Sequence, residues 1–144
     1  MTLSTILCPI DFSEATEPLV AYAAALAAGT GAELRILHVL EPQPTLDGPS
    51  DLDLAQRLAH YHAAATQAGA SVSTAIVPGA DAAAEIVADA KRQSADMIVI
   101  GAHGRTGLKR FLMGNTAEVV VRTASCVTLL VKSPPAPISY RESA

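Results

Sequence analysis

The sequence has few aromatic side chains: Phe, Tyr and Trp make up only 3% of its 144 residues, and Trp is absent. Half of the residues are nevertheless hydrophobic, so a core can form, and it must consist mainly of Ala, Val, Leu and Ile. Such compact side chains suit helices that pack closely on a sheet. A chain of this length is most simply one domain.

Long apolar runs and an excess of basic residues are missing as well. No apolar run reaches the ~18 residues that a membrane-spanning helix needs. The opening segment MTLSTILCPIDF has no basic part, and Asp11 interrupts its apolar run too early for a signal peptide. The net charge of −4 gives no general attraction to nucleic acid or an acidic membrane. We therefore expect a soluble cytoplasmic protein without nucleic-acid or membrane partners, in which any anion site depends on local groups.

Cysteine is scarce, since Cys8 and Cys126 are the only two. Each lies in an apolar segment, and neither has the His or Cys spacing of a metal site. We expect both thiols to be buried and reduced, as in a cytosolic protein, and we expect no protein-built metal site.

The hydrophobic pattern predicts five strands that alternate with four helices. The expected strands are Thr5–Ile10, Glu33–Val39, Ser71–Val77, Asp96–Gly101 and Cys126–Val131. The expected helices are one that Asp11 or Ser13 caps and that Gly29 and Gly31 end, one over Asp51–Gln67, one that Asp81 opens, and one from Asn115 to about Ala124. Several strands are almost wholly apolar, which is typical of a single parallel sheet with helices on both faces, in the α/β class. The Pro-containing segment 134–144 is predicted to be a disordered tail, so the expected domain spans residues 1–133.

Two short segments favour one strand order over another. Five-stranded sheets of this class commonly have the order 2-1-3-4-5 or 3-2-1-4-5, and ligands bind beyond the carboxyl ends of the strands where the winding reverses. The chemically unusual residues are PIDFS, after the first expected strand, and GAHGRTG, after the fourth. Their position favours 3-2-1-4-5, in which the reversal falls between these two strands.

The loop after the fourth expected strand has the composition of an anion site. Fourteen residues separate Ile100 from Asn115, whereas such loops commonly have about 2–6 residues. Backbone N–H groups of its glycines and of the following helix start can approach an anion, and Asn115 can cap that helix. Positive charge comes from Arg105, Lys109 and Arg110. These features suit a polyphosphate, although a mobile loop with incidental glycines remains an alternative. The sequence has neither the P-loop motif nor a G-x-G-x-x-G dinucleotide motif here.

These residues resemble a known family. Gly101, Gly104 and Gly114 fit G-x2-G-x9-G, the nucleotide signature of ATP-binding universal stress proteins. PIDFS, LRILHV and VTLLVK are also similar to that family, and the resemblance covers roughly Leu3 to Lys132. It implies a Rossmann-like, adenine nucleotide alpha hydrolase-like fold with the order 3-2-1-4-5.

The resemblance also implies roles for single residues. Asp11 would bond the ribose hydroxyls. The adenine pocket would be lined by Pro9, Ile10 and Val39, with the Val39 backbone reading the base edge and His38 packed beside it. Ile100 and Gly101 would lie near the ribose and α-phosphate. The phosphates would be held by Gly104, Arg105, Gly114, Asn115 and Thr116, and Mg²⁺ would bridge phosphate oxygens.

Two positions in the loop need separate comment. The family has Ser or Thr where this sequence has Asn115, and Thr116 could supply the missing hydroxyl. His103 has no partner Ser or Cys evident in the sequence, so we interpret it as a loop histidine that contacts backbone or ligand rather than as a general base.

The resemblance implies an ATP-responsive regulatory module that acts on an unidentified protein partner. A slow ATPase or phosphotransferase and a nucleotide-free dimeric scaffold are alternatives, although no acid near the glycine loop is an evident catalytic base. The segment Cys126–Val131 would form a flat apolar sheet edge, which pairing with a second copy would protect. The family resemblance implies such a homodimer, and cover by the C-terminal tail is the alternative.

Overall fold

The structure is a computed structural model that describes residues 2–42, 50–102 and 115–132. Its elements in chain order are β1 (Thr5–Ile10), α1 (Thr16–Thr30), β2 (Glu33–Leu40), α2 (Asp51–Gln67), β3 (Ser71–Pro78), α3 (Ala82–Arg92), β4 (Met97–Gly101), α4 (Asn115–Thr123) and β5 (Val127–Val131). All strands pair in parallel in one sheet of order β3-β2-β1-β4-β5. The predicted fold class and strand order are confirmed.

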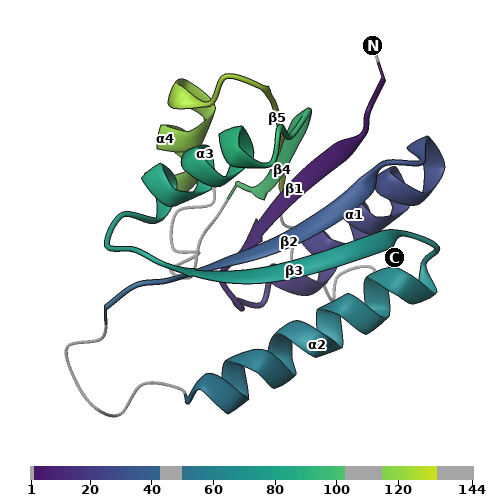
Figure 1. Ribbon diagram of the computed structural model, residues 1–144, viewed down its shortest axis with the longest axis horizontal. Coiled ribbons are helices and arrows are strands. Elements are labelled where there is room, and N and C mark those ends of the chain that lie inside the picture. The colour runs from purple at the N-terminus through teal and green to yellow at the C-terminus, as the bar shows by residue number, and fades with distance from the viewer. Residues whose placement is uncertain (1, 43–49, 103–114, 133–144) are drawn as a thin grey trace, which may run out of the picture.

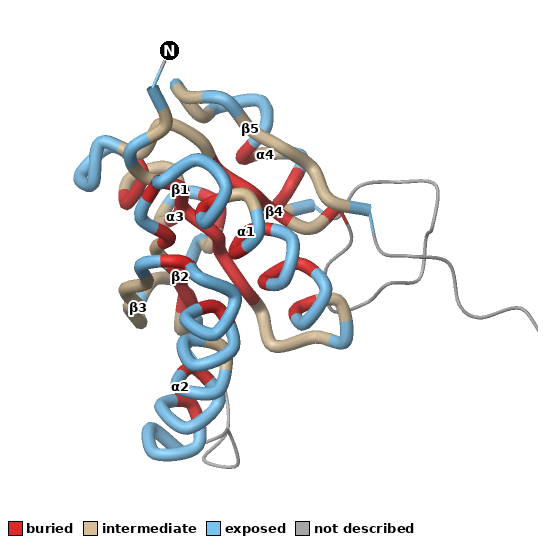
Figure 2. Tube along the Cα trace, turned by 90° about the vertical axis from the view of Figure 1, so that its right-hand side faces the viewer, coloured by how far each residue is buried: buried red, intermediate tan, exposed pale blue. Residues whose placement is uncertain are grey.

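Helices cover both faces of this sheet (Figure 1). One hydrophobic cluster joins α1 and α2 to alternate residues of β1 and β2, including Ile6, Cys8 and Ile36. A second cluster joins α3 and α4 to the intervening residues of β1 and β2, which face the other side of the sheet and include Leu7 and Leu37. The central strand β1 is therefore buried on both sides, as its red trace shows in Figure 2, which explains why its sequence is almost wholly apolar.

Helix α1 begins and ends differently from the prediction. It starts at Thr16, its N-cap position is Ala15, and no side chain caps it, so the expectation that Asp11 or Ser13 caps this helix is wrong. Between β1 and α1 the Asp11 carboxylate instead stabilises a turn. At the other end Gly31 adopts φ of 80° and its N–H donates to the Ala27 carbonyl. Because Gly31 supplies this left-handed terminus, Gly29 lies inside the helix and does not end it.

The other boundaries agree with the prediction to within one residue. Asp81 caps α3, since its Oδ1 accepts from the N–H of Ala84 at 3.2 Å. Asp96 precedes β4 rather than joining it. Its Oδ2 accepts from the N–H groups of Ser4 at 2.8 Å and Thr5 at 3.0 Å, which lowers the pKa of Asp96 and fastens the start of β1. Among the described helices none is long and apolar enough to cross a membrane.

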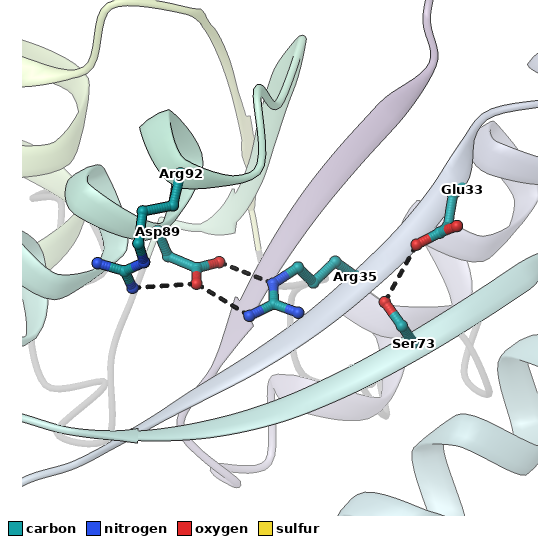
Figure 3. A network of polar contacts seen from close by, with 5 residues as sticks. All are labelled: Glu33, Arg35, Ser73, Asp89 and Arg92. Carbon is teal, nitrogen blue, oxygen red and sulfur yellow. Dashed lines mark hydrogen bonds and ion pairs between the residues drawn. The ribbon is translucent and has the colours of Figure 1, made fainter.

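A charged network ties α3 to the sheet (Figure 3). The Asp89 side chain is 1% exposed, and its two oxygens accept from Nε and Nη2 of Arg35 on β2, both at 2.9 Å. Arg92 adds a third bond, from its Nη2 to Asp89 Oδ1 at 3.2 Å. The hydrogen bond to Asp89 raises the pKa of Arg35. A carboxylate can be buried here because a planar guanidinium satisfies both of its oxygens.

Candidate functional site

A cavity of about 350 Å³ opens at the carboxyl ends of the central strands, between the starts of α1, α3 and α4. This volume is within the usual range for small-ligand pockets. The lining includes eight of the residues that the sequence predicts for a nucleotide site: Pro9, Ile10, Asp11, Val39, Ile100, Gly101, Asn115 and Thr116. Segments far apart in the chain therefore meet at the point where the sheet reverses its winding.

Four predicted site residues lie outside the described part of the chain. They are His103, Gly104, Arg105 and Gly114. The predicted C-terminal tail, residues 134–144, also lies outside it.

The cavity also contains residues that sequence reasoning missed. Ser13, Ala15, Thr16 and Leu19 come from the turn before α1 and the first turns of that helix, and Ala82 and Ile86 come from the start of α3. Glu41 follows directly after β2. The predicted topology could have identified them, because in a parallel sheet the helices that follow the strands all begin at the same edge, where the cavity lies.

Asp11 is positioned by a turn immediately after β1. Its Oδ1 accepts from the N–H of Ser13 at 2.9 Å and from Oγ1 of Thr16 at 3.4 Å. This pattern is an Asx-type turn, in which a carboxylate replaces a backbone acceptor. The turn holds a carboxylate at the mouth of the cavity.

Phe12, the next residue, has a backbone conformation that residues other than glycine rarely adopt. Its φ is 61°, in the left-handed region. Ring contacts hold it there: its centroid lies 4.5 Å from that of His38 and 6.3 Å from that of Tyr61, and Cζ of Arg57 lies 5.7 Å from it. The conformational strain beside Asp11 is thus offset by aromatic packing on α2 and β2.

His38 lies in the cavity lining and is 4% exposed. Its Nδ1 is 2.9 Å from the carbonyl oxygen of Ile10. A carbonyl only accepts, so Nδ1 carries the proton and donates. The hydrogen bond fixes the last residue of β1, and the expected packed histidine is found at this position.

Ser13 carries a buried hydroxyl that lacks a hydrogen-bond partner among the described residues. Buried polar atoms are nearly always paired, so an unpaired one within a cavity lining calls for an explanation. Its position beside Asp11 makes the turn a polar corner in a mostly apolar cavity.

Helix α4 directs its first turn at the cavity. Asn115 is its first described residue, and the chain before it lies outside the described residues, so capping of this helix by Asn115 stays a prediction. Ala117 and Val120, 3% and 0% exposed, anchor the helix against the core. Asn115, Thr116 and Ala117, the first residues of α4, line the cavity, so the positive end of the helix dipole lies at the lining.

Among the described residues, the cysteine thiols and the acidic side chains build neither a redox centre nor a metal centre at the cavity. Burial raises the pKa of Cys8 to about 12, so its thiolate is not formed near neutral pH. Cys126 is only half-buried, which corrects the expectation that both cysteines are buried. No group of three His, Cys, Asp or Glu side chains converges in the part of the chain that the structure describes.

Comparisons with known proteins agree with this arrangement. The model of the universal stress protein family matches residues 2–132. The universal stress protein MJ0531 of Methanocaldococcus jannaschii is 30% identical over 140 residues, which cover 90% of this chain and 82% of that protein.

Solved structures give the same result for the fold. The structure of MJ0577 of Methanocaldococcus jannaschii, which was solved to assign the biochemical function of that protein, has a TM-score of 0.84 and 26% identity, and the match covers 94% of this chain and 100% of that one. A universal stress protein from Archaeoglobus fulgidus, solved in complex with dAMP, has a TM-score of 0.73 and 22% identity, with coverage of 92% and 100%. The chain belongs to the universal stress protein family.

Proposed function

We propose that this protein is a cytoplasmic regulatory module that binds ATP in the cavity, within one nucleotide-binding domain spanning residues 1–133. The observation that carries the proposal is that a carboxylate held by a turn, Asp11, and the first turn of α4 line the same mostly apolar cavity. The carboxylate suits ribose hydroxyls, and the helix start suits phosphate. The dAMP complex of the Archaeoglobus fulgidus relative supports an adenine nucleotide as the ligand.

In this proposal the backbone of Val39 reads the base. Glu33 N–H donates to the Ser4 carbonyl, so the backbone groups of Glu33 point toward β1. Backbone direction alternates along a strand, and Val39, six residues on, points the same way. The paired part of β1 ends at Ile10, opposite His38, so the Val39 carbonyl projects past the end of that strand. It is an acceptor for an exocyclic amine such as that of adenine.

We assign to the remaining lining residues the roles that the family resemblance implies. Pro9 and Ile10 contact the base, and Ile100 and Gly101 at the end of β4 contact the ribose and α-phosphate. Asn115 and Thr116 donate to the phosphates from the start of α4. Only the family resemblance supports the last members of the phosphate site, which are His103, Gly104, Arg105 and Gly114.

Mg²⁺ fits this donor set as a companion of the phosphates. The described cavity lining has only two acids, Asp11 and Glu41, and the described residues contain no cluster of three metal-binding side chains. Mg²⁺ commonly keeps several waters and takes substrate phosphate oxygens as ligands. It would neutralise phosphate charge, while the chain orients the nucleoside.

A thermal unfolding series tests the proposed function. ATP with Mg²⁺ at about a hundred times its Kd should stabilise the protein by ~2.7 kcal/mol, and AMP, cyclic AMP and GTP give the order of preference. Mass spectrometry of the denatured, freshly purified protein should identify any nucleotide that co-purifies. An unchanged melting temperature with every nucleotide, together with no co-purified nucleotide, would leave a nucleotide-free scaffold as the function.

We further propose that β5 pairs with β5 of a second copy. It is an edge strand, and Val127 on it is 44% exposed. Ala102 N–H donates to the Val131 carbonyl, so odd-numbered residues of β5 point their backbone groups toward β4 and even-numbered ones, such as Thr128, point them outward. An outward row of donors and acceptors is a template for another strand.

Thr128→Pro should convert the dimer to a monomer in analytical ultracentrifugation. Proline removes one outward N–H and leaves the ladder to β4 intact, because proline is tolerated where the N–H faces away from the sheet. Thr128→Val, which keeps the N–H, is the matched control and should remain dimeric. A dimer that persists in Thr128→Pro, or a monomeric wild-type protein at micromolar concentration, would contradict pairing through β5.

A further inference from the structure

The ladder between β1 and β4 stops early. It contains the pairs Ile6↔Met97 and Leu7↔Ile98. Both strands continue for three more residues, to Ile10 and Gly101. The ladders on either side do not stop, since β1 pairs with β2 as far as Ile10 and β4 pairs with β5 as far as Gly101. The interruption is therefore local to the gap between the two central strands, where the cavity opens.

Pro9 occupies the first position after the last pair at which a backbone N–H would normally donate to β4. Ser4 accepts from Glu33 of β2, so even-numbered residues of β1 point their backbone groups toward β2 and odd-numbered ones toward β4. Ala102 donates to Val131 of β5, so odd-numbered residues of β4 point theirs toward β1. With Leu7 opposite Ile98, the backbone nitrogen of residue 9 faces the carbonyl of Val99.

Proline has no N–H, so this rung of the ladder cannot form. Proline is rare in central strands for that reason, and the neighbours of Pro9, Cys8 and Val99, are 0% exposed. A β-branched residue such as Val is favoured in strands and would complete the ladder. The strand ends beyond the missing rung, residues 9–10 of β1 and 100–101 of β4, line the cavity.

We propose that Pro9 is a positioning residue that keeps the ends of β1 and β4 unpaired, so that the nucleoside can enter between them without breaking a hydrogen bond. This inference rests on the proposed function for its ligand, and on the strand pairing for its mechanism. An N–H at residue 9 would bond to Val99, close the strand ends, and make ligand binding compete with the sheet.

Pro9→Ala tests the proposal with two measurements. In hydrogen exchange followed by NMR, the new amide of residue 9 should be protected to a degree comparable with the amide of Leu7, which lies on the same side of β1. The affinity for ATP with Mg²⁺, measured by titration calorimetry, should fall about fivefold, which corresponds to one net hydrogen bond of about 1 kcal/mol. Melting temperature is a poor readout, because removing proline also frees the unfolded chain.

Pro78→Ala is the matched control, since it also replaces a strand proline by alanine, but at the exposed end of the edge strand β3 and outside the cavity lining. Its affinity should stay within about twofold of wild type. An unprotected amide at residue 9, or a protected amide with unchanged affinity, would overturn the proposal. A wild-type protein that binds no nucleotide would refute the proposed function instead, and protection of amide 9 would then still decide whether Pro9 interrupts the ladder.

Discussion

Asp89→Ala should lower the free energy of unfolding by about 3–5 kcal/mol, the cost of breaking a buried ion pair by removing one partner. The Asp89 side chain is 1% exposed and accepts two hydrogen bonds from Arg35 and one from Arg92. Its removal leaves the guanidinium of Arg35, only 17% exposed, without the carboxylate that neutralises it. Urea unfolding followed by circular dichroism measures the change.

Two further variants separate the buried pair from ordinary polar contacts. Ser73 Oγ donates to Glu33 Oε1 at 3.3 Å in an exposed contact beside the network (Figure 3), so Ser73→Ala should cost less than about 1 kcal/mol. The double replacement Arg35→Met with Asp89→Leu removes both charges and should recover most of the loss. If Asp89→Ala were no more costly than Ser73→Ala, the network would not fasten α3 to the sheet.

Asp11→Asn should weaken ATP binding about 10- to 100-fold while leaving the fold intact. The amide oxygen of Asn can still accept from Ser13 N–H and Thr16 Oγ1, so the turn before α1 is retained. The negative charge is lost, and hydrogen bonds to charged groups contribute about 1.5–3 kcal/mol. Titration calorimetry measures the affinity, and the melting temperature without ligand checks the fold.

Asp81→Asn is the appropriate control for this experiment. Asp81 also uses Oδ1 to bond a backbone N–H at the start of a helix, but it is exposed and is not part of the cavity lining. Its replacement should leave the affinity unchanged. Equal affinities for ATP in wild type and Asp11→Asn would remove Asp11 from the ribose site and weaken the proposed function directly.

The topology of the sheet was predictable because two kinds of sequence signal agreed. Apolar strands alternating with helices indicated the class, and the unusual segments PIDFS and GAHGRTG favoured the order 3-2-1-4-5, since ligand sites mark the reversal of winding. The family resemblance predicted that Asp11, Gly101 and Asn115 belong to one site, and all three line the cavity.

Features that depend on contacts between distant residues were not predictable. Arg35 and Asp89 are 54 positions apart, and a charged residue within a strand or helix does not reveal its partner. The left-handed conformation of Phe12 results from packing against His38 and Tyr61, and propensity gives no hint of it. The interrupted rung at Pro9 becomes visible only when the register with Val99 is known.

The central position of the first strand has a consequence for synthesis on the ribosome. β1 is made first, and β2 can pair with it as soon as α1 has formed, but β4 pairs with its other edge. The ribosome adds roughly 60 residues between the end of β2 and the start of β4, which takes about 3–12 seconds at typical rates. During that interval the nascent chain carries an uncovered apolar edge, so slowed translation over residues 41–96 should increase its demand for chaperones.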